Sequence, residues 1–158
     1  MPTSFEPASA VLLAIGGVLG YCARYFIARE SSSRKEDWDQ LRSISSDIND
    51  LVDAAREFYC NPPSTDYEKK KIMLKLSGMI KRSNQATFAL SKALGNLECT
   101  RPQVRLRQAI TFQDDAWSTG VALKMNDPVV AEIEEAANAV VGALQLSYFK
   151  RYRKSVVK

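Results

Sequence analysis

The stretch from Leu41 to Phe58 reads LRSISSDINDLVDAAREF, and it decides the fold class. Apolar residues recur in it at alternating intervals of three and four, with Ser, Asp, Asn and Arg between them; they are Leu41, Ile44, Ile48, Leu51, Ala55 and Phe58. This spacing is typical of a helix that buries one face against other helices. The stretch therefore predicts an amphipathic helix, whose apolar face Trp38 and Val52 widen.

Residues on either side of this stretch indicate where the helix begins and ends. Ser33-Arg34-Lys35-Glu36 fits a capping box, in which the Ser and Glu side chains bond the free N–H groups of a helix start. Asn61-Pro62-Pro63 predicts the end, because proline has no N–H and holds the preceding residue extended.

A second capping box at Thr65-Asp66-Tyr67-Glu68 predicts the start of the next helix. Gly95, Asn96 and Pro102 mark its end. Ile80, Phe88 and Leu94 broaden the inward-facing seam of this helix. The seam is long, and its residues are Ile72, Leu76, Met79, Ser83, Ala86, Leu90, Ala93 and Leu97. The small residues at the middle of this seam predict close helix packing, and the alternative is a ligand pocket in the bundle.

Two further helices complete the expected fold. A third helix is expected to begin near Pro102, with a possible interruption at Ser118-Thr119-Gly120. Asn126-Asp127-Pro128 is a cap followed by a proline and predicts the start of a fourth. The apolar residues of the third are Val104, Leu106, Ile110, Trp117, Val121 and Leu123, and those of the fourth are Val130, Ile133, Ala137, Val140 and Leu144.

The whole pattern predicts an all-α chain whose residues 36–158 form an antiparallel bundle of about four helices. Consecutive helices joined by short loops run up, down, up and down. The alternative is an elongated antiparallel hairpin with two shorter helices wrapped on it.

Before the bundle, residues 8–28 read ASAVLLAIGGVLGYCARYFIA, with Arg24 as the single charge. At 1.5 Å per residue such a helix covers about 31 Å, close to the thickness of a bilayer's hydrocarbon core. The Arg24 side chain can extend to the headgroups, and Tyr21, Tyr25 and Phe26 suit the interface. We predict a transmembrane helix over these residues.

Two other interpretations of this segment are a buried helix of a soluble protein and a cleaved signal peptide. A signal peptide begins with basic residues, whereas residues 1–7 contain only Glu6 as a charge. A lipoprotein site at Cys22 requires a small residue before the cysteine, and Tyr21 precedes it. An uncleaved anchor fits better than either.

Charge sets the expected orientation. Residues 1–7 carry no Lys or Arg, whereas Arg24, Arg29, Arg34 and Lys35 lie at or beyond the other end of the span. Because basic flanks stay on the cytoplasmic side, the expected topology is single-pass, with the N-terminus out and the C-terminal domain in the cytoplasm. Residues 1–7 then form a short external stub, and residues 29–35 a basic juxtamembrane linker at the inner membrane.

The predicted span also carries small residues at four-residue spacing. Gly16 and Gly20 form a G-x-x-x-G motif, and Ala10 and Ala14 a second small pair. Small residues at this spacing let two helix backbones approach closely in lipid. These four residues are the predicted transmembrane-association face.

Helix parity places further basic residues near the membrane. If the first helix leaves the bilayer, the loop before the third helix and the C-terminus return to it. The predicted membrane-surface residues are Arg24, Arg29, Arg34, Lys35, Arg101, Arg105, Arg107, Lys150, Arg151, Arg153 and Lys154. Tyr148, Phe149 and Tyr152 suit the same interface. The alternatives are a basic final turn that complements the helix dipole, and nucleic-acid binding, which a net charge of only +4 does not favour.

The same composition argues against enzymatic chemistry. The chain has no histidine, which excludes the common nucleophile systems and the usual zinc sites. The sequence holds no phosphate-binding glycine loop, and Cys60 and Cys99 read as plain thiols. Glu132, Glu134 and Glu135 read as a favourably placed first helical turn. We therefore expect no catalytic residue, metal or cofactor.

These features predict a membrane-anchored, non-enzymatic interaction or scaffold protein that serves as an accessory subunit of a membrane-associated complex. Its expected partners are membrane lipid and either a protein partner or further copies of itself, with no nucleic acid. One alternative is a self-assembling effector that perturbs or permeabilises the bilayer. The other is a regulatory bundle that binds a small ligand.

Overall fold

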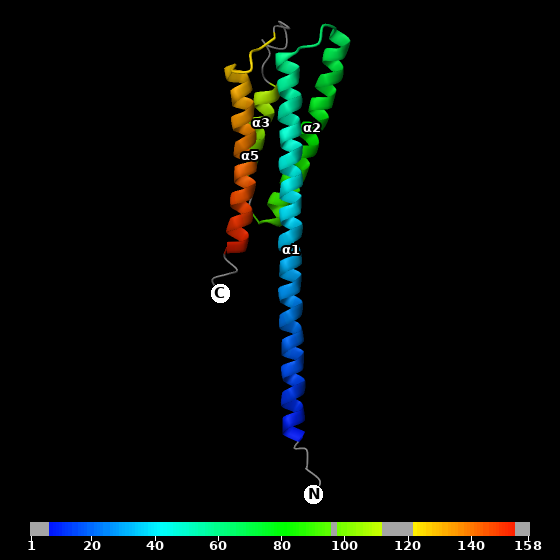
Figure 1. Ribbon diagram of the computed structural model, residues 1–158, viewed down its shortest axis with the longest axis vertical. Helices are drawn as coiled ribbons and strands as arrows, with labels where there is room; N and C mark the ends of the chain where they lie inside the picture. Colours follow the sequence, from blue (N-terminus) through cyan, green and yellow to red (C-terminus); the bar gives the residue numbers. More distant parts are fainter. Residues whose placement is uncertain (1–6, 96–97, 112–121, 154–158) are drawn as a thin grey trace. The chain divides into compact units, whose positions relative to one another are not determined.

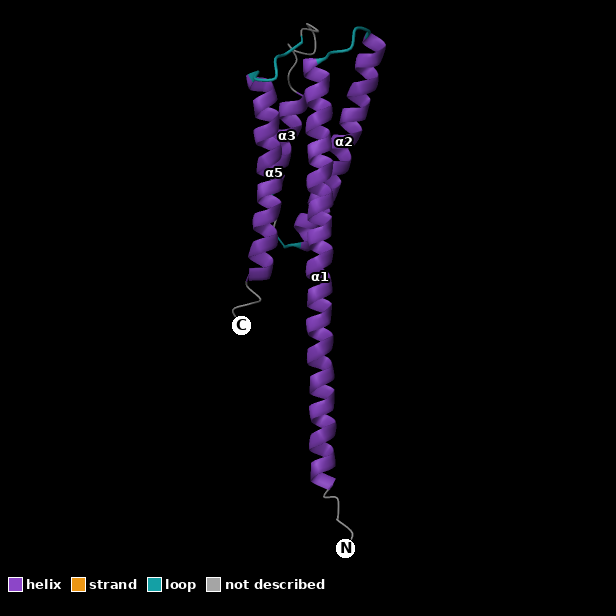
Figure 2. Cartoon of the chain, viewed as in Figure 1, coloured by secondary structure: helices purple, strands orange, loops and turns teal. Residues whose placement is uncertain are grey.

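The computed structural model describes residues 7–95, 98–111 and 122–153, with side chains from residue 20 onwards. These residues form helices α1 (Pro7–Cys60), α2 (Asp66–Ala93), α3 (Thr100–Thr111) and α5 (Pro128–Arg153), joined by loops and without a strand in the described ranges (Figure 1, Figure 2). The chain divides into two compact units, Met1–Asp37 and Trp38–Lys158. The predicted all-helical bundle is confirmed for the second unit.

All four helices contribute to a single core in the second unit. Every seam residue predicted between Leu41 and Phe58 is buried there, as is every one predicted in the fourth helix from Val130 to Leu144. The largest fully buried side chains include Ile48, Ile110 and Leu144. Burial of one such side chain stabilises the fold by about 1.5–3 kcal/mol, so the seams supply the main driving force.

Consecutive helices of this unit run antiparallel (Figure 1). The Tyr59 hydroxyl at the end of α1 donates to the Ile110 carbonyl in α3 at 2.7 Å. The backbone N–H of Leu123 donates to the Tyr59 carbonyl at 2.9 Å. We call this the far end of the bundle. The opposite end, where the chain enters at Trp38, where α2 ends and α3 begins, and where α5 ends, is called the entry end.

The capping box predicted at Ser33-Arg34-Lys35-Glu36 is wrong as a helix start. Helix α1 continues through it without a break, so residues 29–35 are helical. No glycine or proline lies between Tyr21 and Cys60 to interrupt the helix. An ion pair from Arg34 to Glu30, 3.2 Å long and one helical turn apart, adds a small local stabilisation.

Both ends of α2 follow the sequence prediction. Thr65 caps the helix start with extended backbone, and its Oγ1 accepts from the Glu68 N–H at 3.3 Å. The Thr65 hydroxyl donates in turn to the Glu68 carboxylate at 3.0 Å. Gly95 ends the helix at φ +72°, a left-handed conformation that glycine adopts without a Cβ clash.

The starts of α3 and α5 are also close to those predicted. Pro102 lies in the first turn of α3, where its missing N–H is not needed. The Asp127 carboxylate caps α5 by accepting from the Val129 N–H at 3.0 Å. Residues 112–121, which include the predicted Trp117, Val121 and Ser118-Thr119-Gly120 features, lie outside the described part of the chain.

The inward face of α2 differs from the predicted seam at its C-terminal half. Phe88 is 54% exposed, whereas Thr87 beside it is fully buried. Ala93 is exposed as well. Ser83, Thr87 and Ser91 lie on the buried face of α2, beside the fully buried Leu90. Val104, one of the apolar residues of the third helix, lies outside the core, because its side chain is 49% exposed.

Within the described part of the chain, no helix carries an apolar stretch long enough to cross a bilayer. The predicted span from Ala8 to Ala28 lies in α1, but the side chains of residues 8–19 are outside the described set.

Substitution in the core of α5 tests the packing described above. Leu144→Ala is expected to lower the free energy of unfolding by about 2–5 kcal/mol, because Leu144 is fully buried. Leu146→Ala, two residues away and 59% exposed, is the matched control and should change it by less than about 0.5 kcal/mol. Chemical denaturation of the full chain measures both. Equal losses for the two variants would contradict the assigned helix face.

Candidate functional site

Aromatic side chains gather at the entry end of the bundle. The ring centroid of Trp38, the first residue of the second unit, lies 5.2 Å from that of Tyr148 and 6.5 Å from that of Phe149. Tyr148 contacts Phe149 at 5.7 Å and Tyr152 at 4.8 Å. Tilted and edge-on rings at these distances attract beyond simple burial. We call Trp38, Tyr148, Phe149 and Tyr152 the aromatic cluster.

The aromatic cluster is only partly withdrawn from water. Trp38, Tyr148 and Tyr152 are half-buried, while Phe149 remains 54% exposed. Leu144, one turn before Tyr148, is buried on the same helix. Because Leu144, Tyr148 and Tyr152 are spaced by four residues, the two tyrosines continue the inward face beyond the core. The cluster therefore forms an amphipathic rim at the entry end.

Three cations lie in the last turn of α5, which also carries Tyr152 of the aromatic cluster. The Arg151 guanidinium lies 5.5 Å from the centroid of the Tyr152 ring, within the range of a cation–π contact. Lys150 pairs with Glu98 at 3.1 Å, which ties the end of α5 to the segment before α3. Arg153 is exposed in the same last turn of α5. Three cations at the C-terminal end of a helix also interact favourably with its dipole.

Because consecutive helices run antiparallel, some, but not all, of the predicted membrane-surface residues of the second unit lie at the entry end. Lys150, Arg151 and Arg153 lie there with Arg101, which is exposed in the first turn of α3. Arg105 instead pairs with Glu135, near the start of α5, at 3.1 Å. Arg107 is exposed as well, but it lies further along α3 from the entry end than Arg101 does. Lys154 lies outside the described residues.

The other predicted residues belong to the first unit. Arg24, Arg29 and Lys35 are exposed, and Arg34 pairs with Glu30. Gly20 is exposed, and a methyl group in place of its hydrogen would meet no described atom within 4 Å. The side chains of the other predicted association residues, Ala10, Ala14 and Gly16, lie outside the described set.

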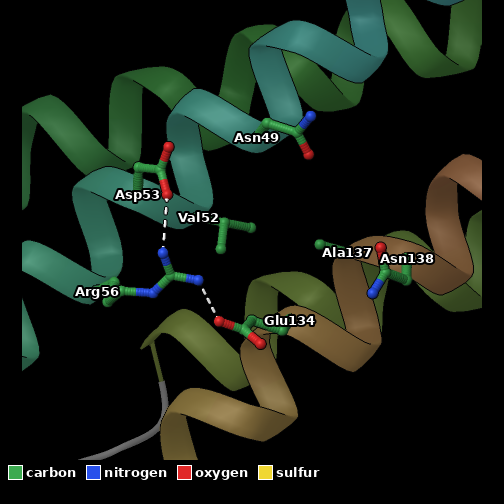
Figure 3. A pocket seen from close by; sticks show the side chains of 7 residues that line it. All are labelled: Asn49, Val52, Asp53, Arg56, Glu134, Ala137 and Asn138. Atoms are coloured by element: carbon green, nitrogen blue, oxygen red, sulfur yellow. Dashed lines mark hydrogen bonds and ion pairs between the residues drawn. The ribbon is translucent and has the colours of Figure 1, made fainter. Parts of the chain in front are cut away.

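A polar groove of about 350 Å³ runs between α1 and α5, and sequence reasoning did not predict it (Figure 3). Arg56 donates to Asp53 at 3.1 Å and to Glu134 across the groove. The hydrogen bond to Glu134 raises the pKa of Arg56 above the ordinary arginine value, against an opposing effect of burial. The residues that line the groove are Asn49, Val52, Asp53, Arg56, Glu134, Ala137 and Asn138.

The ion pair between Arg56 and Glu134 in this groove joins α1 to α5. The prediction that Glu134 and Glu135 lie in the first helical turn is wrong, because α5 begins at Pro128 and its first turn holds no acidic residue. Each of the two pairs with an arginine of another helix. No three metal-ligating side chains gather among the described residues. The three cysteines, Cys22, Cys60 and Cys99, are free thiols.

Comparison of the chain with family models, curated proteins and solved structures finds no match.

A double-mutant cycle tests the aromatic cluster. Trp38→Leu and Tyr148→Leu are each expected to destabilise the bundle, with a coupling energy of about 0.5–1.5 kcal/mol because the two rings are in contact. Urea unfolding of the full chain, followed by circular dichroism, measures the cycle. Trp38→Leu combined with Tyr67→Leu is the control, since Tyr67 is 77% exposed on α2. A coupling near zero for Trp38 and Tyr148 would contradict the packing.

Proposed function

We propose that this chain is a membrane-anchored, non-enzymatic interaction module, an accessory subunit of a membrane-associated complex. Residues 8–28 are its single transmembrane span, with the N-terminus outside. The bundle lies at the cytoplasmic face of the membrane, with its entry end toward the lipid headgroups. Its role is to present a rigid helical surface to a protein partner at a fixed place.

The aromatic cluster, with the cations in the last turn of α5, is the observation that carries this proposal. Trp38 follows Ala28 by only ten residues, and ten residues reach at most about 36 Å even when fully extended. An anchor at residues 8–28 therefore keeps the aromatic cluster close to the bilayer. Trp and Tyr rings favour the headgroup region, where one side of the ring meets lipid and the polar group meets water.

The charge distribution of α5 supports the same placement. No acidic residue follows Glu135, so the second half of this helix and the C-terminal residues carry only positive charge. Each Lys or Arg near an anionic leaflet contributes up to about 1 kcal/mol of attraction. The helix dipole alone explains cations in the last turn, but it does not explain a half-exposed aromatic cluster beside them.

Confinement to a surface is what such a module contributes to a complex. Two proteins anchored in one membrane meet at a much higher effective concentration than they would in solution. A modest interface on the bundle is then sufficient for stable association. The proposal consequently needs no cavity or catalytic group.

The anchor is tested by alkaline carbonate extraction of membranes that contain the full chain. The natural chain is expected in the pellet, and Leu12→Arg with Ile15→Arg should shift it to the supernatant. Each arginine near the middle of a span costs about 2.5–3.5 kcal/mol of insertion free energy. Leu12→Met with Ile15→Met keeps the segment apolar and should stay in the pellet. Release of the natural chain would contradict the anchor.

The position of the entry end is tested by fluorescence quenching of Trp38 in a Trp117→Phe background. The full chain is reconstituted in vesicles of phosphatidylcholine and phosphatidylglycerol, with lipids brominated near the headgroup. The bromine should quench Trp38, and Lys150→Glu, Arg151→Glu and Arg153→Glu together should reduce that quenching at least about twofold.

A control variant carries the same change of charge away from the entry end of the bundle. Lys70→Glu, Lys81→Glu and Lys124→Glu alter exposed residues, and quenching should be unchanged. Equal effects of the two triple variants, or no quenching of the natural chain, would contradict the proposed placement.

A further inference from the structure

Helices α1 and α2 of the bundle present unpaired charges of opposite sign on neighbouring outer strips. On α1, the exposed carboxylates of Asp47 and Asp50 line a surface groove of about 170 Å³ between the two helices. Met79, Arg82 and Ser83 of α2 line the other side of the same groove. One acidic strip and one basic strip therefore border a common surface.

The basic strip continues along α2. Lys71, Lys75 and Arg82 are exposed, and their spacing of four and seven residues places them along one side of the helix. Helix α2 contains no acidic residue after Glu68, so nothing of opposite charge interrupts this strip. The acidic strip likewise continues along α1 beyond Asp50 and Asp47 to Asp39.

No ion-pair partner for these charges is found among the described residues. The ion pairs seen among the described residues join other side chains. Asp47, Asp50, Lys71, Lys75 and Arg82 are all left without one. Opposite charges that are exposed and unpaired on adjacent strips are available to a complementary surface.

We propose that this surface binds a second copy of the chain in parallel orientation, with the basic strip of each copy against the acidic strip of the other. The two copies are related by a two-fold axis parallel to the helices, so α1 of each copy faces α2 of its partner. Both charge contacts form in one symmetric arrangement. This inference deepens the proposed function, on which the parallel orientation of the two copies depends.

The register of the two helices permits these contacts. The end of α1 and the start of α2 are joined by a short loop and lie together at the far end of the bundle (Figure 1). Asp50 and Asp47 lie about 15–20 Å along α1 from Cys60, and Lys71, Lys75 and Arg82 lie about 8–24 Å along α2 from Asp66. In parallel copies the two charged stretches therefore meet at similar heights.

The surface is also large enough for a specific dimer. From Trp38 to Cys60 the helix extends about 34 Å, and two helices of about 10 Å width offer roughly 700 Å² per copy. The total of about 1,400 Å² matches a standard protein interface. Because charges dominate it, the interface should be sensitive to salt, and confinement to one membrane should strengthen it.

Charge reversal tests this pairing in the full chain. Asp47→Lys with Asp50→Lys makes both strips basic, and Lys71→Glu with Lys75→Glu makes both acidic. Each variant alone then repels its own copies, and the dissociation constant of the dimer should rise about tenfold or more. Sedimentation equilibrium in a mild neutral detergent measures it. Raising the salt from about 50 to about 500 mM should weaken the natural dimer in the same direction.

Mixing the two variants distinguishes this surface from any other. A 1:1 mixture restores attraction at both contacts, so heterodimers should form within about threefold of the natural affinity. A single chain that carries all four reversals should likewise recover its homodimer. Lys70→Glu with Lys81→Glu is the matched control, because both residues are exposed on α2 but lie outside the basic strip. The dissociation constant of the dimer should be unchanged in this variant.

Several results would overturn the pairing. An unchanged dissociation constant in both charge variants would show that the copies associate through another surface, for example the predicted span. Weakening by the lysine reversals alone would mean that α2 faces an anionic surface or a different protein. A monomeric natural chain would also overturn it. Carbonate extraction reports separately on the anchor, so a chain released from membranes that still follows the charge pattern would keep the pairing and lose the proposed function.

Discussion

Burial of the apolar side chains along α1, from Leu41 to Phe58, is the interaction on which the rest of the bundle depends. This seam supplies core residues from one helix along its whole bundled length, and α2, α3 and α5 complete the cluster. Each fully buried Leu or Ile contributes about 1.5–3 kcal/mol relative to exposure, which no surface ion pair approaches. The helices that cover the seam then determine which polar side chains remain outside.

Once the seam is covered, the remaining faces carry a defined charge pattern. Arg56 and Arg105 of α1 and α3 pair with Glu134 and Glu135 in the first half of α5. The end of the same helix places cations beside the aromatic cluster. Helix α5 therefore carries its acidic residues in its first half and cations in its last turn, and the entry end of the bundle becomes its positive end. The proposed contact with anionic headgroups follows from that polarity.

Patterns local to one helix could be predicted from the sequence. The seams of α1 and α5 follow from apolar spacing alone, and the caps at Thr65 and Asp127 follow from side chains that satisfy free N–H groups. The predicted start at Ser33 is wrong because the same capping chemistry is compatible with an unbroken helix when no glycine or proline interrupts it. Local sequence cannot separate those two cases.

Features that depend on how helices rotate against one another could not be predicted. Thr87 faces inward and Phe88 outward on α2, although side-chain size favours the opposite. The pairing of Arg56 with Glu134 joins residues 78 positions apart, and no spacing rule indicates it. The aromatic cluster was only half predicted: its α5 residues were assigned to an interface, whereas their contact with Trp38 arises from packing.

The most direct test of the account is the mass and composition of the complex that a tagged full chain forms when membranes are extracted in a gentle detergent. The account predicts that the chain is recovered from the membrane fraction in a complex of more than one protein chain at fixed stoichiometry. A lone monomer, or a chain found in the soluble fraction, would contradict the claim that this is a membrane-anchored interaction module.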